Sequence, residues 1–193
     1  QRTTDTDPTN NRRPRSNIDF ACGETVWLAY VPVEYQSTGE PLVERVRPGI
    51  GDNFVRAIFP VGEWNYYRAP VPALDWNQDI NNSSVQLLNR LRDIRLTDIP
   101  ATGGTRPEFV YGWLPGNPYS GNGRAIGIPG DAAFGNTQLS RSQRTFAHEM
   151  GHLFDLSHNS ESINQLGVDV EHHLLETQNL DQIFPTTRFD IMV

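Results

Sequence analysis

The feature that most constrains the fold of this chain is the run from His148 to His158, which contains three of its five histidines. Residues four apart lie above one another on an α-helix, so His148 and His152 can direct two imidazoles at one point. Glu149 lies about 100° further round the helix, close to that point. His158 can reach the same point only if the helix ends after His152 and the chain reverses. The run therefore predicts a helix followed by a turn.

The spacing of the first three residues is that of a metal site with an adjacent acid–base group. In the HExxH pattern two neutral imidazoles bind zinc, and the glutamate takes a proton from the metal-bound water. His148 and His152 are thus candidate ligands of Zn2+, and Glu149 is the candidate catalytic base. Three protein ligands and one water form the open arrangement of a catalytic zinc, whereas four protein ligands form a structural site.

The run resembles the metzincin metallopeptidases, whose pattern is HExxHxxGxxH followed by a methionine-containing turn. The resemblance implies that His148, His152 and His158 are the zinc ligands and that Glu149 is the general base. It also implies a zinc-dependent endopeptidase of the reprolysin-like type, secreted or displayed at the cell surface, that hydrolyses peptide bonds with a glutamate-activated water.

Two further positions bear on this resemblance. Phe189-Asp190-Ile191-Met192 resembles the Met-turn, which would place Met192 beneath the metal. Asp155 stands where the family usually has glycine, at a position where the chain turns with positive φ. Because Asp and Asn are the non-glycine residues that best tolerate left-handed geometry, we interpret Asp155 as a helix terminator that costs roughly 1 kcal/mol against glycine.

Apolar runs and turn residues predict the elements around this helix. Strands are expected at 25–33, 64–69, 108–114 and 124–128. A short helix is expected after Asp52-Asn53, and an amphipathic helix after caps at Asn81 to Ser83, with Leu87, Leu88, Leu91 and Ile94 on its core face. Ser140 to Gln143 fits a capping box that would start the zinc helix at about Arg141, with Phe146, Met150 and Leu153 packing inward.

The expected fold class is α/β or α+β. By resemblance to metzincins it has a twisted, mostly parallel sheet with an antiparallel edge strand, a backing helix, an active-site helix and a small irregular C-terminal subdomain. In that family the strand just before the zinc helix is an exposed edge, so a protein or peptide substrate would lie extended along Arg124–Ile128. The alternative is an ordinary edge strand without a binding role.

The length of 193 residues fits a single domain with a loose end. Residues 1–18 are polar and are expected to be a flexible leader, and 19–193 a single catalytic metallopeptidase domain. Its N-terminal subdomain would cover about 19–154 and its C-terminal subdomain about 155–193. Metzincins continue with a further helix after the Met-turn, so we expect a minimal or truncated C-terminal part. The chain contains no signal-peptide pattern, so the expected compartment comes from the resemblance alone.

Composition excludes several other classes of protein. The net charge is −7, and no basic stripe stands out, so nucleic acid is a poor candidate partner. No apolar run has the length of a membrane span. The single cysteine, Cys22, excludes an internal disulfide and cysteine-rich metal sites. An isolated Cys-Gly is weak support for a cysteine switch, in which the Cys22 thiolate would bind the zinc. We expect a monomer.

Two alternatives stay open from the sequence. Glu171 or Glu176 could supply the third ligand, as in thermolysin-like gluzincins, although His158 would then have no role. The domain could also be a non-catalytic metzincin-like module that binds protein or glycan, although a dead site would not need Glu149. Residues 165–184 show no clear period and are expected to be mostly loop, with a helical turn near His172 to Thr177; His172 and His173 are expected at its surface.

Overall fold

The computed structural model describes residues 25–59, 61–101, 106–138, 140–158, 167–169 and 182–184. The strands of its main sheet are β1 (Thr25–Tyr35), β2 (Glu63–Arg68), β3 (Leu74–Trp76), β4 (Phe109–Leu114), β5 (Gly123–Ala125) and β6 (Ala132–Asn136). The helices are α1 (Val43–Val46), α2 (Asn53–Ile58), α3 (Ile80–Asp93) and α4 (Ser142–Leu153), and a π-helical turn η1 (Ile94–Asp98) continues α3. Two further strands, β7 (Gly167–Asp169) and β8 (Gln182–Phe184), pair with each other antiparallel.

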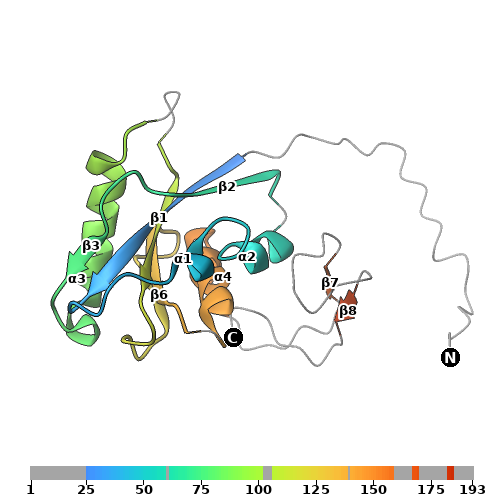
Figure 1. Ribbon diagram of the computed structural model, residues 1–193. Helices are drawn as coiled ribbons and strands as arrows, with labels where there is room; N and C mark the ends of the chain where they lie inside the picture. Colours follow the sequence, from blue (N-terminus) through green and yellow to red (C-terminus); the bar gives the residue numbers. More distant parts are fainter. Residues whose placement is uncertain are drawn as a thin grey trace, which may run out of the picture.

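The main sheet has six strands and is mostly parallel. Its order is β2-β1-β4-β6-β5, with β3 paired to the last part of β1. Only β5 runs antiparallel, at the edge beside β6. Helix α3 covers one face of the sheet, and α1, α2 and α4 lie on the other, so the sheet is the middle layer of three (Figure 1). The expected α/β class, mostly parallel sheet and antiparallel edge strand are confirmed.

Strand β1 is buried on both faces because helices cover both sides of the sheet. Its residues alternate between two cores. Ala29, Val31 and Val33 pack with α3, whereas Val26, Leu28 and Tyr30 pack with α2 and α4. A parallel strand covered on both faces is expected to be apolar, as β1 is from Val26 to Val33. The predicted strand at 25–33 is confirmed and extends to Tyr35.

The predicted amphipathic helix is confirmed as α3, but its cap was assigned wrongly. The N-cap is Asp79, whose Oδ1 accepts a hydrogen bond of 3.1 Å from the N–H of Asn81. Ser83 instead accepts a hydrogen bond from the indole N–H of Trp76 and has φ −124°. The predicted leucine face is buried, with Leu87 and Leu91 fully enclosed against the sheet.

Helix α4 also begins differently from the prediction. Arg141 is its N-cap, and no side chain caps it. The predicted capping box does not form, because the side chain of Gln143 donates to the carbonyl of Ile50 at 3.0 Å instead. A tertiary partner thus replaces the local one. The predicted core face is confirmed: Phe146 and Met150 are fully buried and Leu153 nearly so.

Two strands of the sheet, β3 and β6, were not predicted. Strand β6, Ala-Ala-Phe-Gly-Asn, has no β-branched residue, and its propensity for strand is weak. It forms because β4 and β5 pair with it from both sides. In the stretch expected to be mostly loop, β7 and β8 are strands, while the helical turn near His172 lies outside the described residues, as do the leader 1–18 and Met192.

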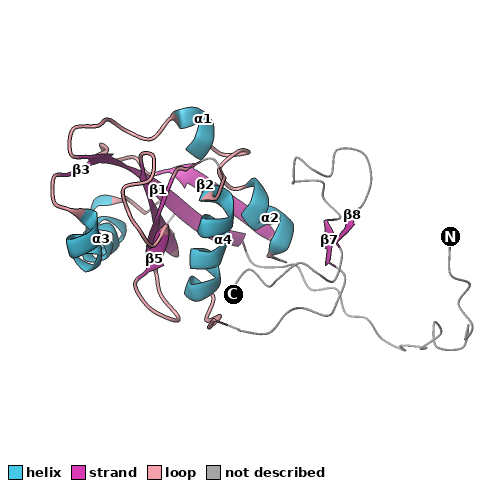
Figure 2. Ribbon diagram, turned by 90° about the horizontal axis from the view of Figure 1, so that it is seen from below, coloured by secondary structure: helices cyan, strands magenta, loops and turns pink. Residues whose placement is uncertain are grey.

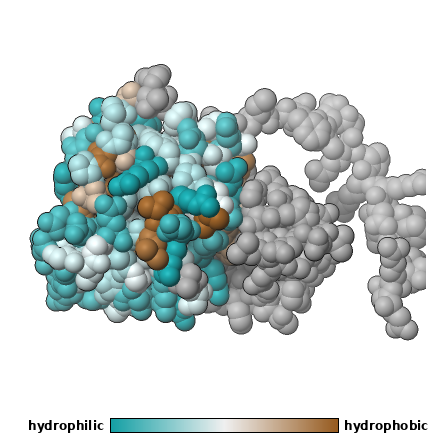
Figure 3. Space-filling model, viewed as in Figure 1, coloured by the Kyte–Doolittle hydropathy of each residue, from teal (hydrophilic) through white to brown (hydrophobic). Residues whose placement is uncertain are grey.

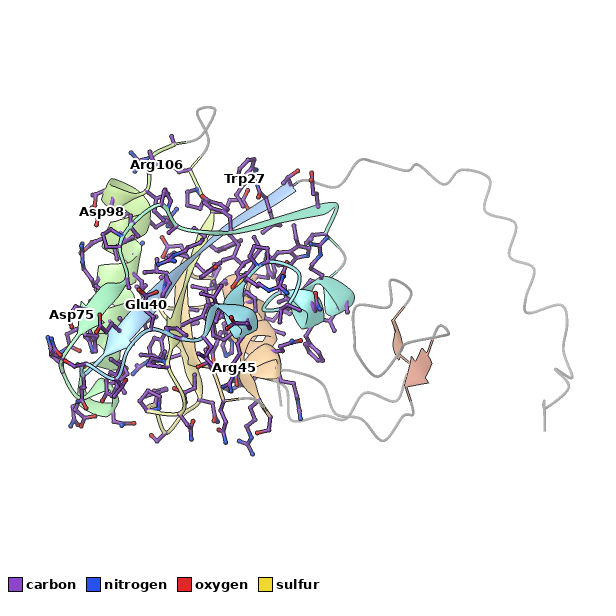
Figure 4. All side chains as sticks on the ribbon, in the orientation of Figure 1. Trp27, Glu40, Arg45, Asp75, Asp98 and Arg106 are labelled. Carbon is purple, nitrogen blue, oxygen red and sulfur yellow. The ribbon has the colours of Figure 1, made fainter. Side chains whose placement is uncertain are left out.

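The surface over α1 is mostly hydrophilic with a small apolar patch (Figure 3). Leu42 and Val43 at the start of α1 are the large hydrophobic residues exposed there. The guanidinium of Arg45 donates to the carbonyl of Thr137 at 3.1 Å and ties α1 to the end of β6 (Figure 4). Within the described part of the chain, no helix has both the length and the apolarity to cross a membrane.

Candidate metal centre

Helix α4 ends in a chain reversal centred on Asp155. The backbone φ of Asp155 is 70°, as the sequence predicted for a left-handed position. The N–H of Leu156 donates to the carbonyl of Gly151 at 2.9 Å, and the N–H of Asp155 donates to that of His152 at 3.1 Å. This pair of bonds is the Schellman motif, with aspartate in the place that glycine usually takes. The reversal turns the chain back toward the helix it has just left.

The reversal brings His158 against the two histidines of α4. Its Nε2 lies 3.0 Å from Nε2 of His148 and 3.1 Å from Nε2 of His152. In a tetrahedral site with Zn–N bonds of about 2.0 Å, ligand nitrogens lie about 3.3 Å apart. The three nitrogens therefore have close to the separation that a shared ion requires. These three histidines could hold a metal ion.

The ring of His152 is oriented by a second hydrogen bond. Its Nδ1 lies 2.8 Å from the carbonyl oxygen of Leu156. Because a carbonyl only accepts, Nδ1 carries the proton and donates, and Nε2 is left with a lone pair for a metal. Burial lowers the pKa of His152, which keeps the ring neutral. The turn after α4 thus both positions His158 and selects the ligand tautomer of His152.

Glu149 lies beside the three histidines and is buried, with 5% of its surface exposed. Burial raises the pKa of Glu149 to about 8, although a backbone hydrogen bond from Ala125 and the charge of Arg124 both lower it. Both of these partners belong to β5. The carboxyl group is therefore held between α4 and β5, and at a pKa of about 8 it is mostly protonated at neutral pH unless a bound cation lowers that pKa.

A cleft of about 710 Å³ runs along this edge of the sheet. Seen from below, α4 lies next to β5 (Figure 2). One wall is β5 with the loop after it, and the other is the face of α4 that carries the ligands. The described residues that line the cleft are Gly121, Asn122, Gly123, Arg124, Ala125, Gly127, Ile128, Arg141, Arg144, Thr145, His148, Glu149, His152 and His158.

The structure brings together the four predicted site residues and places most of the predicted edge segment on the same cleft. It also adds residues that the sequence reasoning missed, namely Gly123, Arg141 and Arg144. The last two could have been found, because they precede His148 by seven and four residues and therefore share its face of the helix. The other candidates lie outside the described residues: Met192, Glu171, Glu176, His172, His173 and Cys22.

Comparison of the chain with protein-family models, with curated proteins and with solved structures finds no significant match. The geometry of α4, β5 and the turn at Asp155 therefore has to carry the functional assignment.

Proposed function

We propose that the protein is a zinc-dependent endopeptidase of the metzincin type. The observation that carries this proposal is the convergence of three imidazole Nε2 atoms beside the buried carboxyl group of Glu149. Nε2 of His158 lies 3.0 Å from that of His148 and 3.1 Å from that of His152. Three protein ligands would leave one coordination position open, as catalytic zinc sites do.

The donor set supports zinc as the metal. Imidazole nitrogens suit zinc and its neighbours in the first transition row, whereas calcium and magnesium require oxygen ligands. When bound, zinc would supply Lewis acidity, which lowers the pKa of a coordinated water to about 7 and polarises a carbonyl oxygen. His148, His152 and His158 would hold it, with His152 oriented by the carbonyl of Leu156.

Glu149 is suited to move the proton. Its carboxylate is buried at the wall of the cleft, within reach of a water there, and can take a proton on one oxygen and deliver it to the leaving nitrogen of a peptide. The hydrogen bond from Ala125 holds the carboxylate in one orientation. Burial raises the pKa of Glu149 to about 8, and the charge of Arg124 only partly opposes this. A zinc ion bound beside it would favour the ionised form that a base needs before the reaction begins.

Strand β5 is suited to bind the substrate. It is the last strand of the sheet, and no other strand of the described chain pairs with its outer edge. That edge borders the cleft, and an extended peptide could add to it as a further strand. Backbone hydrogen bonds would then align a peptide bond past Glu149 and the histidines. The expected substrate site was Arg124–Ile128, of which only Arg124 and Ala125 belong to β5; the strand ends at Ala125, and residues 126–128 form the loop after it.

The test is the Glu149→Gln variant, assayed with casein and with a fluorogenic peptide library, with and without a chelator. We expect wild-type activity to require the metal, and the variant to bind one zinc per chain as tightly but to lose about a hundredfold to ten-thousandfold in rate. The control is Glu44→Gln, which removes the same negative charge at an exposed position of α1 and should retain full activity.

Equal cleavage by Glu149→Gln and wild type would show that Glu149 is not the base. A wild type that is fully loaded with zinc and cleaves nothing would contradict the peptidase and favour the alternative of a non-catalytic binding module.

A further inference from the structure

Two arginines of the cleft form no ion pair within the described residues. The side chains of Arg141 and Arg144 are exposed on the helical wall, and no carboxylate in the described part of the chain forms an ion pair with either. Of the eleven arginines in the described residues, five form such pairs and six do not. Three of the six that do not, Arg124, Arg141 and Arg144, line this cleft. In a chain of net charge −7, this concentration of unpaired positive charge at one cleft indicates that the cleft receives negative charge.

The opposite wall adds a third positive charge. Arg124 of β5 donates from its guanidinium to Oγ of Ser84 at 2.8 Å, so its side chain is anchored to the start of α3. Its charge acts on Glu149 from the strand side. Both walls of the cleft are therefore positive, while Glu149 lies buried between them.

The helical register places Arg144 relative to the candidate metal. Arg144, His148 and His152 follow one another at intervals of four, so they form one row along α4. Each interval rises about 6 Å, and an extended peptide advances about 3.3 Å per residue. A substrate lying along β5 would therefore present side chains to Arg144 and Arg141 about two to four residues from the peptide bond that is cleaved.

We propose that the cleft selects acidic polypeptide stretches, with Arg141 and Arg144 as the residues that recognise aspartate or glutamate to one side of the cleaved bond. The position of that bond rests on the peptidase function proposed above. Guanidinium groups bind carboxylates through paired, charge-assisted hydrogen bonds. The same charges would also draw an acidic chain into the cleft against the negative charge of the protein as a whole.

The hydrolysis experiment compares matched peptides. Cleavage sites in a casein digest, mapped by mass spectrometry, give the sequence that wild type cuts best. Two fluorogenic versions of it then carry glutamate or glutamine at the positions two to four residues from the bond. We expect kcat/KM to be about fivefold to tenfold higher for the glutamate peptide in wild type, and equal for the two peptides in Arg141→Gln/Arg144→Gln.

The control is Arg47→Gln/Arg106→Gln, which changes net charge by the same amount at exposed positions outside the cleft. Arg106 lies near the end of α3, well away from α4 (Figure 4). This control should keep the preference for glutamate. Loss of the preference in both double variants would show that overall charge causes it, and would overturn the proposal. If the double variant at the cleft unfolds, Arg144→Gln alone should still reduce the preference.

A binding experiment separates this proposal from the peptidase. It uses Glu149→Gln with zinc and measures fluorescence polarisation with labelled peptides in which alanine alternates with glutamate or with glutamine. We expect about fivefold tighter binding of the glutamate peptide, weakening as salt screens the charges.

Equal binding of the two peptides would overturn the proposal even if the wild type is an active peptidase. Selective binding without cleavage by the wild type would contradict the peptidase and leave the acidic selectivity standing. If a single-stranded oligonucleotide of the same charge competes as well as the glutamate peptide does, the cleft is a general polyanion-binding surface. That result would also overturn the proposal.

Discussion

Gly123 of β5 and Glu149 of α4 approach so closely that no side chain fits between them. A Cβ atom on Gly123 would lie 2.8 Å from Oε1 of Glu149 and 2.5 Å from Cγ2 of Thr145. The absence of a side chain at Gly123 therefore allows the edge strand to hold the candidate base against the helix. In the proposed mechanism this contact aligns the substrate-binding strand with the group that moves the proton.

We expect Gly123→Ala to reduce kcat/KM by about tenfold to hundredfold without loss of zinc, because Glu149 must shift to make room. Peptidase kinetics and zinc content measured on the same preparation check this. Val85→Ala, a change at an exposed position of α3 outside the cleft, is the control. Normal kinetics in Gly123→Ala would mean that the position of Glu149 does not limit the reaction.

His158→Ala should weaken zinc binding by at least about a hundredfold, because it removes one of three converging nitrogens. Glu171→Ala should leave the affinity unchanged. Competition with a fluorescent chelator measures both constants. The opposite pattern would identify the glutamate as the third ligand and remove His158 from the site.

Asp155→Val should destabilise the fold by about 1–2 kcal/mol and weaken zinc binding, because a β-branched residue is strained at φ 70°. Asp155→Gly should keep zinc affinity and stay within about 1 kcal/mol of wild type, since glycine adopts this geometry freely. Urea unfolding and zinc titration of both variants check the pair. Equal stability of the valine variant would show that the reversal does not need left-handed geometry.

Two buried tyrosines should respond oppositely to loss of their hydroxyl. The hydroxyl of Tyr66 donates to the carbonyl of Val46 at 2.7 Å and accepts from the indole N–H of Trp113 at 2.8 Å. The hydroxyl of Tyr111 has no hydrogen-bond partner among the described residues. We therefore expect Tyr66→Phe to lower the free energy of unfolding by about 1–3 kcal/mol, and Tyr111→Phe to leave it unchanged or higher. Urea unfolding measures both.

Tyr66 and Tyr111 should also make the free energy of unfolding decrease at alkaline pH. Burial raises the pKa of Tyr66 and of Tyr111 well above the usual 10.0. The unfolded chain would lose these protons first, so their contribution to stability is complete below about pH 10 and declines as pH rises further. Tyrosinate absorbance should show these two of the six tyrosines ionising only on unfolding, and only one in each Phe variant. Full titration of all six in the folded protein would contradict this.

The sequence predicted the elements whose signal is local and failed where a distant partner decides. The leucine face of α3 and the apolar run of β1 carry clear periods or runs, and both were predicted correctly. The capping box at Ser140 was wrong because Gln143 bonds to Ile50, 93 positions away. Strand β6 was missed because its pairing with β4 and β5, rather than its own residues, makes it a strand.

By itself, the sequence determined the spacing of His148, His152 and His158 and the reversal at Asp155, because helix periodicity and left-handed tolerance act within a few residues. Only the tertiary structure decided that β5 lies against α4, that Glu149 is buried there and that Arg141 and Arg144 face the same cleft. The physical reason is range. Backbone geometry is set by neighbours along the chain, whereas burial and charge environment are set by whatever the fold brings close in space.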